Sequence, residues 1–270
     1  MTNDLKCRKI NILRSLKVPL YLVSVVPLVY SWLNSSFSRS LIFVLSLIFV
    51  LSSQFLMNIE MDRLDCEYGK SGMKCGSFIP VGPCLFECVS VEKIRKIAMA
   101  PLALMIITAA LVIIITRLLV LLAFGLFAMI LMFAYLYPPI MLYRRGIGEI
   151  STFFDFGPLL LLGSYYAFTG SIAYSLIPAS VGFGLIASAV RLSHHIIEEP
   201  EGTARKRLYV PAFSIMVIIS SILVGLRPGI AHTILIFISV VIAAMSIIVK
   251  DSQKVSAAAI IYLVVFAFLA

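Results

Sequence analysis

Residues 40–67 read SLIFVLSLIFVLSSQFLMNIEMDRLDCE, an apolar run that ends in a cluster of four carboxylates. A helix needs about 20 mostly apolar residues to cross the hydrocarbon core of a bilayer, and residues 40–60 meet that need. Like charges beside a membrane are costly unless a cation joins them. The stretch therefore predicts a membrane-spanning helix whose polar end contributes to a cation-binding site.

A second cluster of carboxylates follows the apolar segment 175–192 and reads HHIIEEPE over residues 194–201. The two clusters together hold seven of the 13 carboxylates in the chain. Mg²⁺ prefers oxygen ligands and recruits the phosphate oxygens of a substrate. Two carboxylate-bearing helix ends that face each other would form such a site, so we expect Asp62 and Glu198 to converge on one pocket.

The composition predicts an all-α integral membrane protein. Hydrophobic residues make up 61% of the chain and charged residues only 13%, with a mean hydropathy of +1.07, whereas about half of a soluble domain is apolar. The spans and their connectors fill the chain, which predicts a single domain over residues 1–270, without a soluble domain or a cleavable signal peptide. We predict nine transmembrane helices, over residues 17–36, 40–60, 98–116, 118–137, 153–173, 175–192, 209–226, 230–249 and 255–270.

The basic residues predict the orientation of the chain. With nine spans, nineteen of the 22 Lys and Arg residues fall on the side of the N-terminus. In membrane proteins generally, Lys and Arg concentrate in the cytoplasmic segments. The N-terminus is therefore expected inside the cell and the C-terminus outside. The net charge of +9 then reflects orientation and attraction to anionic lipids. We expect a multi-pass protein of the cell membrane with its active site on the cytoplasmic side, no nucleic-acid partner and no obligate protein partner.

The first cluster is compatible with a helix. Asn58, Asp62 and Asp65 lie at i, i+4 and i+7, which places them on one helical face, and Gln54 extends that face by one turn. Oxygen ligands in this arrangement suit Mg²⁺. The alternative is a solvated helix end at the membrane interface, although solvation alone would not require Gln, Asn and Asp on a single stripe.

The second cluster repeats the pattern. Glu198 and Glu201 are three residues apart, and His194 and His195 precede Glu198 by one turn. The histidines could ligate Zn²⁺ or Fe, but that would require a second pair of ligands, and none is obvious. We therefore expect neutral histidines that line the pocket through hydrogen bonds.

Basic residues near these motifs could serve in either of two roles. Arg144 and Arg145 follow the predicted fourth span, and Lys206 follows the second cluster. Arginine matches a diphosphate through two parallel hydrogen bonds and stays charged at any relevant pH. The same residues could equally be anchors that obey the positive-inside rule.

Four cysteines fall between residues 61 and 97. Their spacing lacks a C-x-x-C pair, so it is a weak signal for zinc. A loop that faces a reducing compartment favours free thiols. The four residues are Cys66, Cys75, Cys84 and Cys88.

The middle of the chain carries a longer motif. Residues 137–170 read YPPIMLYRRGIGEISTFFDFGPLLLLGSYYAFTG. The pattern Gly-x-Gly-Glu, Phe-Gly-Pro, Gly-x-Tyr-Tyr and Thr-Gly resembles the UbiA superfamily of intramembrane prenyltransferases, and specifically its menaquinone branch, the 1,4-dihydroxy-2-naphthoate polyprenyltransferases. The resemblance covers about residues 15–215 and implies a bundle of nine transmembrane helices.

The first family motif has the form N-x-x-x-D followed by further acids. Asn58 and Asp62 match it, whereas Ile59 stands where the family commonly has Asp. A third acid one turn after Asp62 would fall on Cys66, and Asp65 and Glu67 flank that position.

The second family motif reads N-N-x-x-D-x-x-x-D. His194 and His195 stand in place of the Asn pair, and Glu198 stands in place of the first Asp. Gly202 occupies the position of the second acid, with Glu201 beside it. The carboxylates are therefore present but displaced from the family pattern.

The resemblance implies Mg²⁺-dependent transfer of a polyprenyl group from an allylic diphosphate to an aromatic acceptor, 1,4-dihydroxy-2-naphthoate. The implied catalytic carboxylates are Asp62, Asp65, Glu198 and Glu201, which with Asn58 would hold the metal. The implied diphosphate ligands are Asn58, Arg144, Arg145 and Lys206. The implied acceptor or cation pocket contains Tyr165, Tyr166, His194 and His195, although either tyrosine could simply pack between helices or lie in the interfacial belt.

Two other functions stay open. One is prenyl transfer to a different acceptor, such as a glycerol-phosphate ether lipid, a hydroxybenzoate or a porphyrin side chain. The other is a transporter or a catalytically silent relative that binds lipid. Transporters usually place ionisable groups near the middle of their spans, and the predicted spans have essentially none there, which argues against transport.

Overall fold

The protein is built from helices. A computed structural model describes residues 17–67, 91–196, 203–224, 229–249 and 251–270, and this part of the chain contains no strand. The helices are η1 (Val18–Tyr21), α2 (Leu22–Asn34), α3 (Ser40–Glu67), α4 (Val91–Thr116), α5 (Val120–Leu136), α6 (Gly148–Phe154), the π-helical turn η2 (Asp155–Leu159), α7 (Leu160–Thr169), η3 (Tyr174–Leu176), α8 (Ile177–His195), α9 (Ala204–Val224), α10 (Ile230–Ile248) and α11 (Ser252–Leu269).

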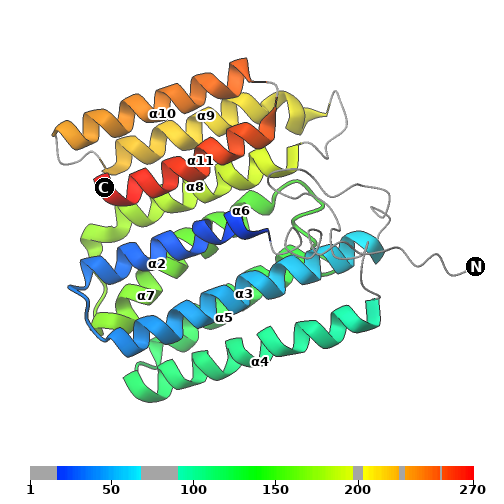
Figure 1. The fold of residues 1–270 in the computed structure, drawn as a ribbon, viewed down its shortest axis with the longest axis vertical. Coiled ribbons are helices and arrows are strands. Elements are labelled where there is room, and N and C mark those ends of the chain that lie inside the picture. The colour runs from blue at the N-terminus through cyan, green and yellow to red at the C-terminus, as the bar shows by residue number, and fades with distance from the viewer. Residues whose placement is uncertain (1–16, 68–90, 197–202, 225–228, 250) are drawn as a thin grey trace, which may run out of the picture.

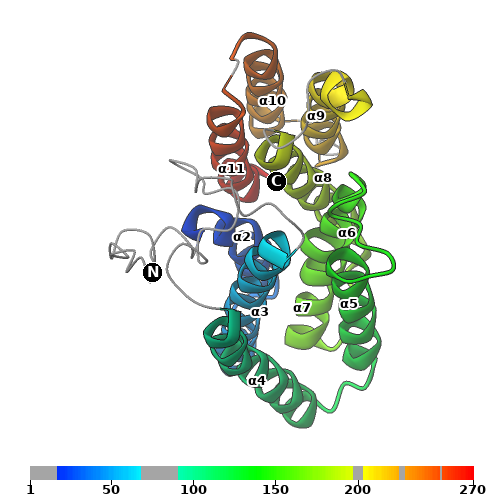
Figure 2. The same ribbon diagram turned by 90° about the vertical axis from the view of Figure 1, so that its right-hand side faces the viewer.

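The long helices lie side by side in one bundle and alternate in direction along the chain (Figures 1 and 2). At one edge of the bundle lies α4, which packs mainly against α3, and at the other lies α10. The central helix is α8, which contacts α6, α9 and α11. We call the end of the bundle where α3 and α8 finish and α4, α6 and α9 begin the polar end.

The outer helices are apolar on the surface that they expose. In the part of the chain that the structure describes, six helices are long and apolar enough to cross a membrane, and Val18–Asn34 and Val120–Leu136 are shorter apolar helices. Large side chains such as Ile114, Leu119 and Leu126 are exposed on α4 and α5. An apolar surface of this extent is incompatible with water but suits lipid. The prediction of an all-α membrane protein is therefore confirmed.

The predicted apolar segments are helical over most of their described lengths, but several boundaries differ from the prediction, among them the end of α3 at Glu67 and the start of α9 at Ala204. The helix expected to begin at residue 98 begins at Val91, and the segment expected to begin at residue 153 begins at Gly148. The prediction used hydrophobicity alone, and a helix continues into the polar region as long as its backbone hydrogen bonds are satisfied. The expected connectors over 61–97 and 143–149 are correspondingly shorter than predicted.

Local sequence signals explain several helix ends. Asp251 caps α11, because its side chain accepts a hydrogen bond of 3.0 Å from the backbone N–H of Gln253. The end of α7 is set by Gly170, which has a φ of 78° that favours glycine. Between α6 and α7 the helix widens into a π turn at Pro158, which has no N–H to donate.

A close contact between glycines positions that π turn against α8. A Cβ added to Gly157 would lie 2.5 Å from the carbonyl oxygen of Ser180, and one added to Gly184 would lie 2.6 Å from that of Phe153. Both neighbours are backbone atoms, which cannot move as a flexible side chain would. Small residues at such crossings allow transmembrane helices to approach closely.

We expect Gly184→Ala to destabilise the protein by about 1–3 kcal/mol, because the added methyl group overpacks the contact between α8 and the segment that contains Phe153. The matched control is Gly125→Ala on α5, where a Cβ would meet no atom within 4 Å. Thermal unfolding of the detergent-solubilised protein measures both. Equal melting temperatures for the two variants would contradict the proposed contact.

Candidate functional site

The last three turns of α3 carry polar side chains on two opposite faces. Successive residues in an α-helix are 100° apart, so residues separated by four or seven positions share a face, and those separated by two positions do not. Gln54, Asn58 and Asp62 form one set, which we call the Asp62 face. Glu60, Arg63 and Glu67 form the other, which we call the Glu60 face.

The Asp62 face points toward α2 and the segment that precedes it. Ser24 on α2 donates a hydrogen bond of 3.1 Å to Oε1 of Gln54, and Nε2 of Gln54 lies 3.4 Å from Oδ1 of Asn58. Asn58 and Asp62 are both buried, and Asp62 is only 1% exposed. Three residues of the predicted stripe, Gln54, Asn58 and Asp62, therefore form a line of buried or half-buried side chains that carry oxygen atoms, whereas the side chain of Asp65 lies outside the description.

Asp62 forms an ion pair with Lys17, which precedes η1. The distance from Lys17 Nζ to Asp62 Oδ1 is 2.9 Å, and both side chains are almost completely buried. A buried carboxylate is strongly destabilising unless a cation or hydrogen bonds compensate its charge. The Lys17 ammonium group supplies that compensating positive charge.

A second network joins α3 to three further helices. Met61 is adjacent to Asp62, and its sulfur lies 3.7 Å from the hydroxyl of Tyr135 on α5. Arg191 on α8 donates from Nε to that hydroxyl over 3.0 Å and from Nη1 to Glu149 Oε1 over 2.6 Å. Its guanidinium also lies 5.1 Å from the centre of the Tyr135 ring. This network brings α3, α5, α6 and α8 together at the polar end.

Gly148 makes room for this network at the start of α6. A Cβ at that position would overlap the guanidinium of Arg191. Glu149, the next residue, also accepts a hydrogen bond of 2.8 Å at its carbonyl oxygen from Ser188. The Gly-Glu pair of the sequence motif thus has a structural role, because the glycine admits the arginine and the glutamate pairs with it.

The two histidines of the second motif lie at the polar end of α8, one turn beyond Arg191. His194 is buried, and its ring centre lies 5.0 Å from that of His195. Helices α3 and α8 therefore bring Asp62 and His194 to the same end of the bundle. Glu198 and Glu201 lie outside the residues that the structure describes, so their convergence with Asp62 stays a prediction.

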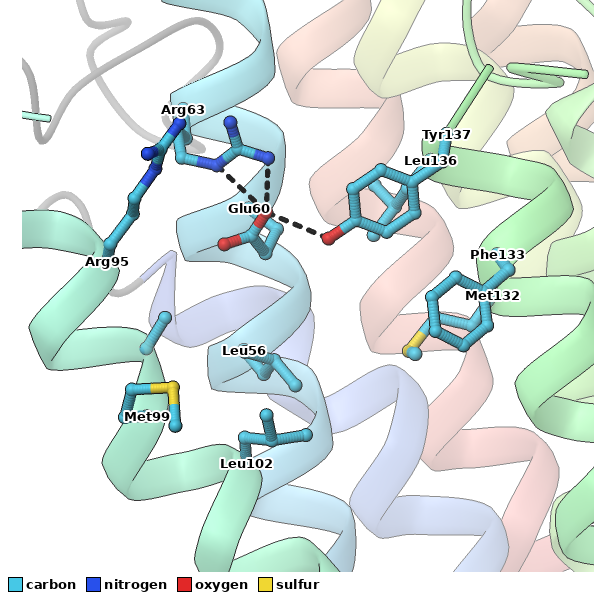
Figure 3. A pocket seen from close by; sticks show the side chains of 11 residues that line it. Leu56, Glu60, Arg63, Arg95, Met99, Leu102, Met132, Phe133, Leu136 and Tyr137 are labelled. Atoms are coloured by element: carbon cyan, nitrogen blue, oxygen red, sulfur yellow. Dashed lines mark hydrogen bonds and ion pairs between the residues drawn. The ribbon is translucent and has the colours of Figure 1, made fainter. Parts of the chain in front are cut away.

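The Glu60 face makes its own network toward α4 and α5 (Figure 3). Arg63 donates to Glu60 Oε2 from Nε over 3.0 Å and from Nη2 over 2.8 Å, and its Nη1 lies 2.6 Å from Glu67 Oε1. Tyr137 donates to Glu60 over 2.9 Å.

A cavity of about 540 Å³ borders the Glu60 face and not the Asp62 face. Its polar rim includes Glu60, Arg63, Arg95 and Tyr137, and below them the lining is apolar (Figure 3). Helix α3 therefore separates this cavity from the stripe that the sequence predicts to bind metal. The lining residues of this cavity do not include Asn58 or Asp62.

The three basic residues predicted to bind the diphosphate are distant in sequence from the Asp62 face. Arg144 and Arg145 are exposed on the turn after α5, and Nη2 of Arg145 donates to the carbonyl oxygen of Pro139 over 2.8 Å. Lys206 is half-buried in the first turn of α9, where its N–H lies 3.3 Å from Thr203 Oγ1. All three belong to segments that meet at the polar end.

Tyr165 and Tyr166 lie near the opposite end of the bundle. They are 17 residues from Gly148, the first residue of α6 at the polar end, which corresponds to roughly 25 Å along a helix. The half-buried ring of Tyr166 stacks on Phe124 with centres 6.4 Å apart. The structure therefore does not bring these tyrosines together with Asp62, and packing between α5 and α7 accounts for Tyr166.

The described residues do not by themselves form a metal site. Among them, no group of three or more His, Cys, Asp or Glu side chains could hold a metal ion. The side chains of Asp65 and Cys66 and the residues Cys75, Cys84 and Cys88 lie outside this description. The Asp62 face has a buried carboxylate that lies near amide oxygens and pairs with an ammonium group. Oxygen ligands of this kind fit a hard cation such as Mg²⁺ better than Zn²⁺.

Several residues at the polar end were missed by sequence reasoning. Arg63 lies three residues after Glu60 and four before Glu67, and this helical spacing alone could have predicted its ion pairs. Arg191 lies one turn before His194, so it could have been added to the second motif. Lys17 could not have been found in this way, because 45 residues separate it from Asp62.

No family model matches the chain, and no curated protein matches it. The case for a function therefore depends on the residues and contacts described above. Its strongest element is the buried, cation-paired stripe on α3 at the polar end.

We expect Asp62→Asn to lower the free energy of unfolding by about 3 kcal/mol, because it removes the carboxylate that pairs with the buried Lys17 ammonium group. The double variant Lys17→Met with Asp62→Asn removes both charges and should recover most of that loss. Thermal unfolding of Asp62→Asn, Lys17→Met, the double variant and the natural chain gives the coupling energy. Strictly additive effects of the two substitutions would contradict a buried ion pair.

Proposed function

We propose that the protein is an intramembrane prenyltransferase of the UbiA type. It transfers a polyprenyl group from an allylic diphosphate to an aromatic acceptor, 1,4-dihydroxy-2-naphthoate, with Mg²⁺ as cofactor. Nine membrane spans place the N-terminus in the cytoplasm and the C-terminus outside the cell membrane, and the polar end faces the cytoplasm. The lipid bilayer supplies the polyprenyl substrate.

One observation carries this proposal. The motif that the sequence resemblance assigns to metal binding is a buried stripe of oxygen donors at the polar end, and its carboxylate is already paired with a cation. A merely solvated helix end would expose these groups to water. Asn58 and Asp62 are instead among the most buried polar residues of the described chain.

The proposed metal ligands are Asn58, Asp62, Asp65, Glu198 and Glu201. Mg²⁺ bound there would neutralise the diphosphate and favour its departure from the allylic carbon. Lys17 is positioned to exchange its carboxylate partner for a diphosphate oxygen, because its ammonium group already lies at the stripe. The buried position of Lys17, Asn58 and Asp62 excludes water, which strengthens their electrostatic effect.

In the reaction, the bond between the allylic carbon and the diphosphate oxygen breaks, and the electron pair leaves with the diphosphate. The acceptor carbon that carries the carboxylate forms the new bond to the allylic carbon. Carbon dioxide then leaves, and its bonding electrons restore the aromatic ring. His194, buried at the polar end of α8, is the proposed hydrogen-bond partner of an acceptor hydroxyl.

Membranes that contain the protein should form a lipid-soluble product from radiolabelled polyprenyl diphosphate and 1,4-dihydroxy-2-naphthoate in the presence of Mg²⁺, and EDTA should abolish it. We expect Asp62→Asn to lower the rate at least about 100-fold, a typical effect of losing a group that acts on developing charge. The double variant Lys17→Met with Asp62→Asn separates folding from catalysis, because it should be stable but inactive.

The matched control is Glu92→Gln, which alters an exposed carboxylate that pairs with Lys96 at the start of α4. It should retain the activity of the natural chain. Product formation by Asp62→Asn at the natural rate would refute the metal assignment. Product with a hydroxybenzoate but not with the naphthoate would keep prenyl transfer and change the acceptor.

A further inference from the structure

We propose that the cavity between α3, α4 and α5 is a binding site for an anionic phospholipid of the surrounding bilayer. The site lies on the Glu60 face of α3, opposite the stripe that carries the proposed chemistry. The inference is independent of prenyl transfer, because it depends on a different cavity and a different set of residues.

The cavity opens toward lipid. Met99 on α4 and Phe133 on α5 line it and are 61% and 50% exposed. In a membrane, these exposed surfaces contact hydrocarbon chains. Leu56 and Leu102 continue the apolar lining deeper along the helices (Figure 3). An acyl chain can therefore enter the cavity from the bilayer without crossing a polar surface.

The polar rim lies at one end of this apolar lining. On α4, Arg95 is followed by Met99 and Leu102 at i+4 and i+7, so a charged group and two apolar groups share one helical face. Figure 3 shows the arginine at the rim and the apolar side chains below it. This order matches an amphiphile with its head group at the polar end and its chain along the helices.

The rim offers one cation that is weakly paired. Arg63 uses all three of its guanidinium nitrogens on Glu60 and Glu67. Arg95 is 66% exposed, and its contact with Glu67 is long, at 3.5 Å. Its remaining donors can bind the phosphate of a head group, and planar guanidinium groups bind phosphate oxygens in pairs.

The charge balance favours a single negative charge on the ligand. The Glu60 face and the first two turns of α4 together carry four cationic and three carboxylate side chains among the described residues, an excess of one positive charge. A phosphodiester head group carries one negative charge and matches that excess. A diphosphate carries more negative charge than this excess, and the Glu60 carboxylate at the rim would repel it.

The test measures lipid retained by the purified full-length protein in detergent, by native mass spectrometry, with dioleoyl phosphatidylglycerol and dioleoyl phosphatidylethanolamine as probes. We expect about a five-fold preference for phosphatidylglycerol, the effect of one basic residue near a membrane surface. Arg95→Gln should abolish the preference. Leu102→Trp, which fills the apolar part of the cavity, should lower retention of both lipids.

The matched control is Lys254→Gln, because Lys254 is also an exposed cation at the polar end but lies on α11, away from the cavity. It should keep the five-fold preference. Equal retention of the two lipids by the natural chain would overturn the proposal, as would equal losses in Arg95→Gln and Lys254→Gln. Displacement of phosphatidylglycerol by equimolar farnesyl diphosphate without Mg²⁺ would also overturn it and assign the cavity to the prenyl donor.

Discussion

The polar end of the bundle is organised by ion pairs between charged side chains that its helices carry into a lipid environment. Lys17 pairs with Asp62, Arg63 with Glu60, and Arg191 with Glu149, and these side chains are largely buried. In a medium of low dielectric constant, an unpaired ion of either sign is far more costly than a paired one. The pairs therefore decide which helix ends can meet there and how they are turned.

Two of these pairs also connect parts of the chain that are distant in sequence. Asp62 holds the segment before α2 against α3, and Arg191 holds α6 against α8 while it contacts Tyr135 on α5. The third pair is local to α3 but is extended to α5 by Tyr137. Charged contacts between helices thus hold the polar end together. The lipid-facing surfaces of α4 and α5 are apolar and take no part in these contacts.

The helical period gives α3 two separate polar surfaces within three turns. The Asp62 face is buried toward α2, and the Glu60 face borders an apolar cavity that opens to lipid. Such a division lets one helix position a proposed catalytic cation on one side and a membrane lipid on the other. A lipid bound at the Glu60 face would brace α3 against α4 and α5 and so support the geometry of the Asp62 face.

The sequence predicted the helical class and the approximate limits of the helices because long apolar runs leave few alternatives. It also predicted the burial-prone stripe on α3 from the i, i+4 spacing of Asn58 and Asp62. It failed for partners that are distant along the chain: no pattern within α3 indicates Lys17, and no local spacing pairs Glu149 with Arg191. Tyr165 and Tyr166 were grouped with the site by motif, but helix length carries them to the other end of the bundle.

The central claim is that the Asp62 face binds the cation and the diphosphate. The most direct measurement is a cryo-electron microscopy structure with Mg²⁺ and a non-reactive polyprenyl thiolodiphosphate. The account predicts metal and diphosphate density beside Asn58 and Asp62, with Glu198 among the metal ligands and Lys17 moved from Asp62 to a phosphate oxygen. Diphosphate density at Arg95 in the cavity, with the pair between Lys17 and Asp62 intact, would contradict it.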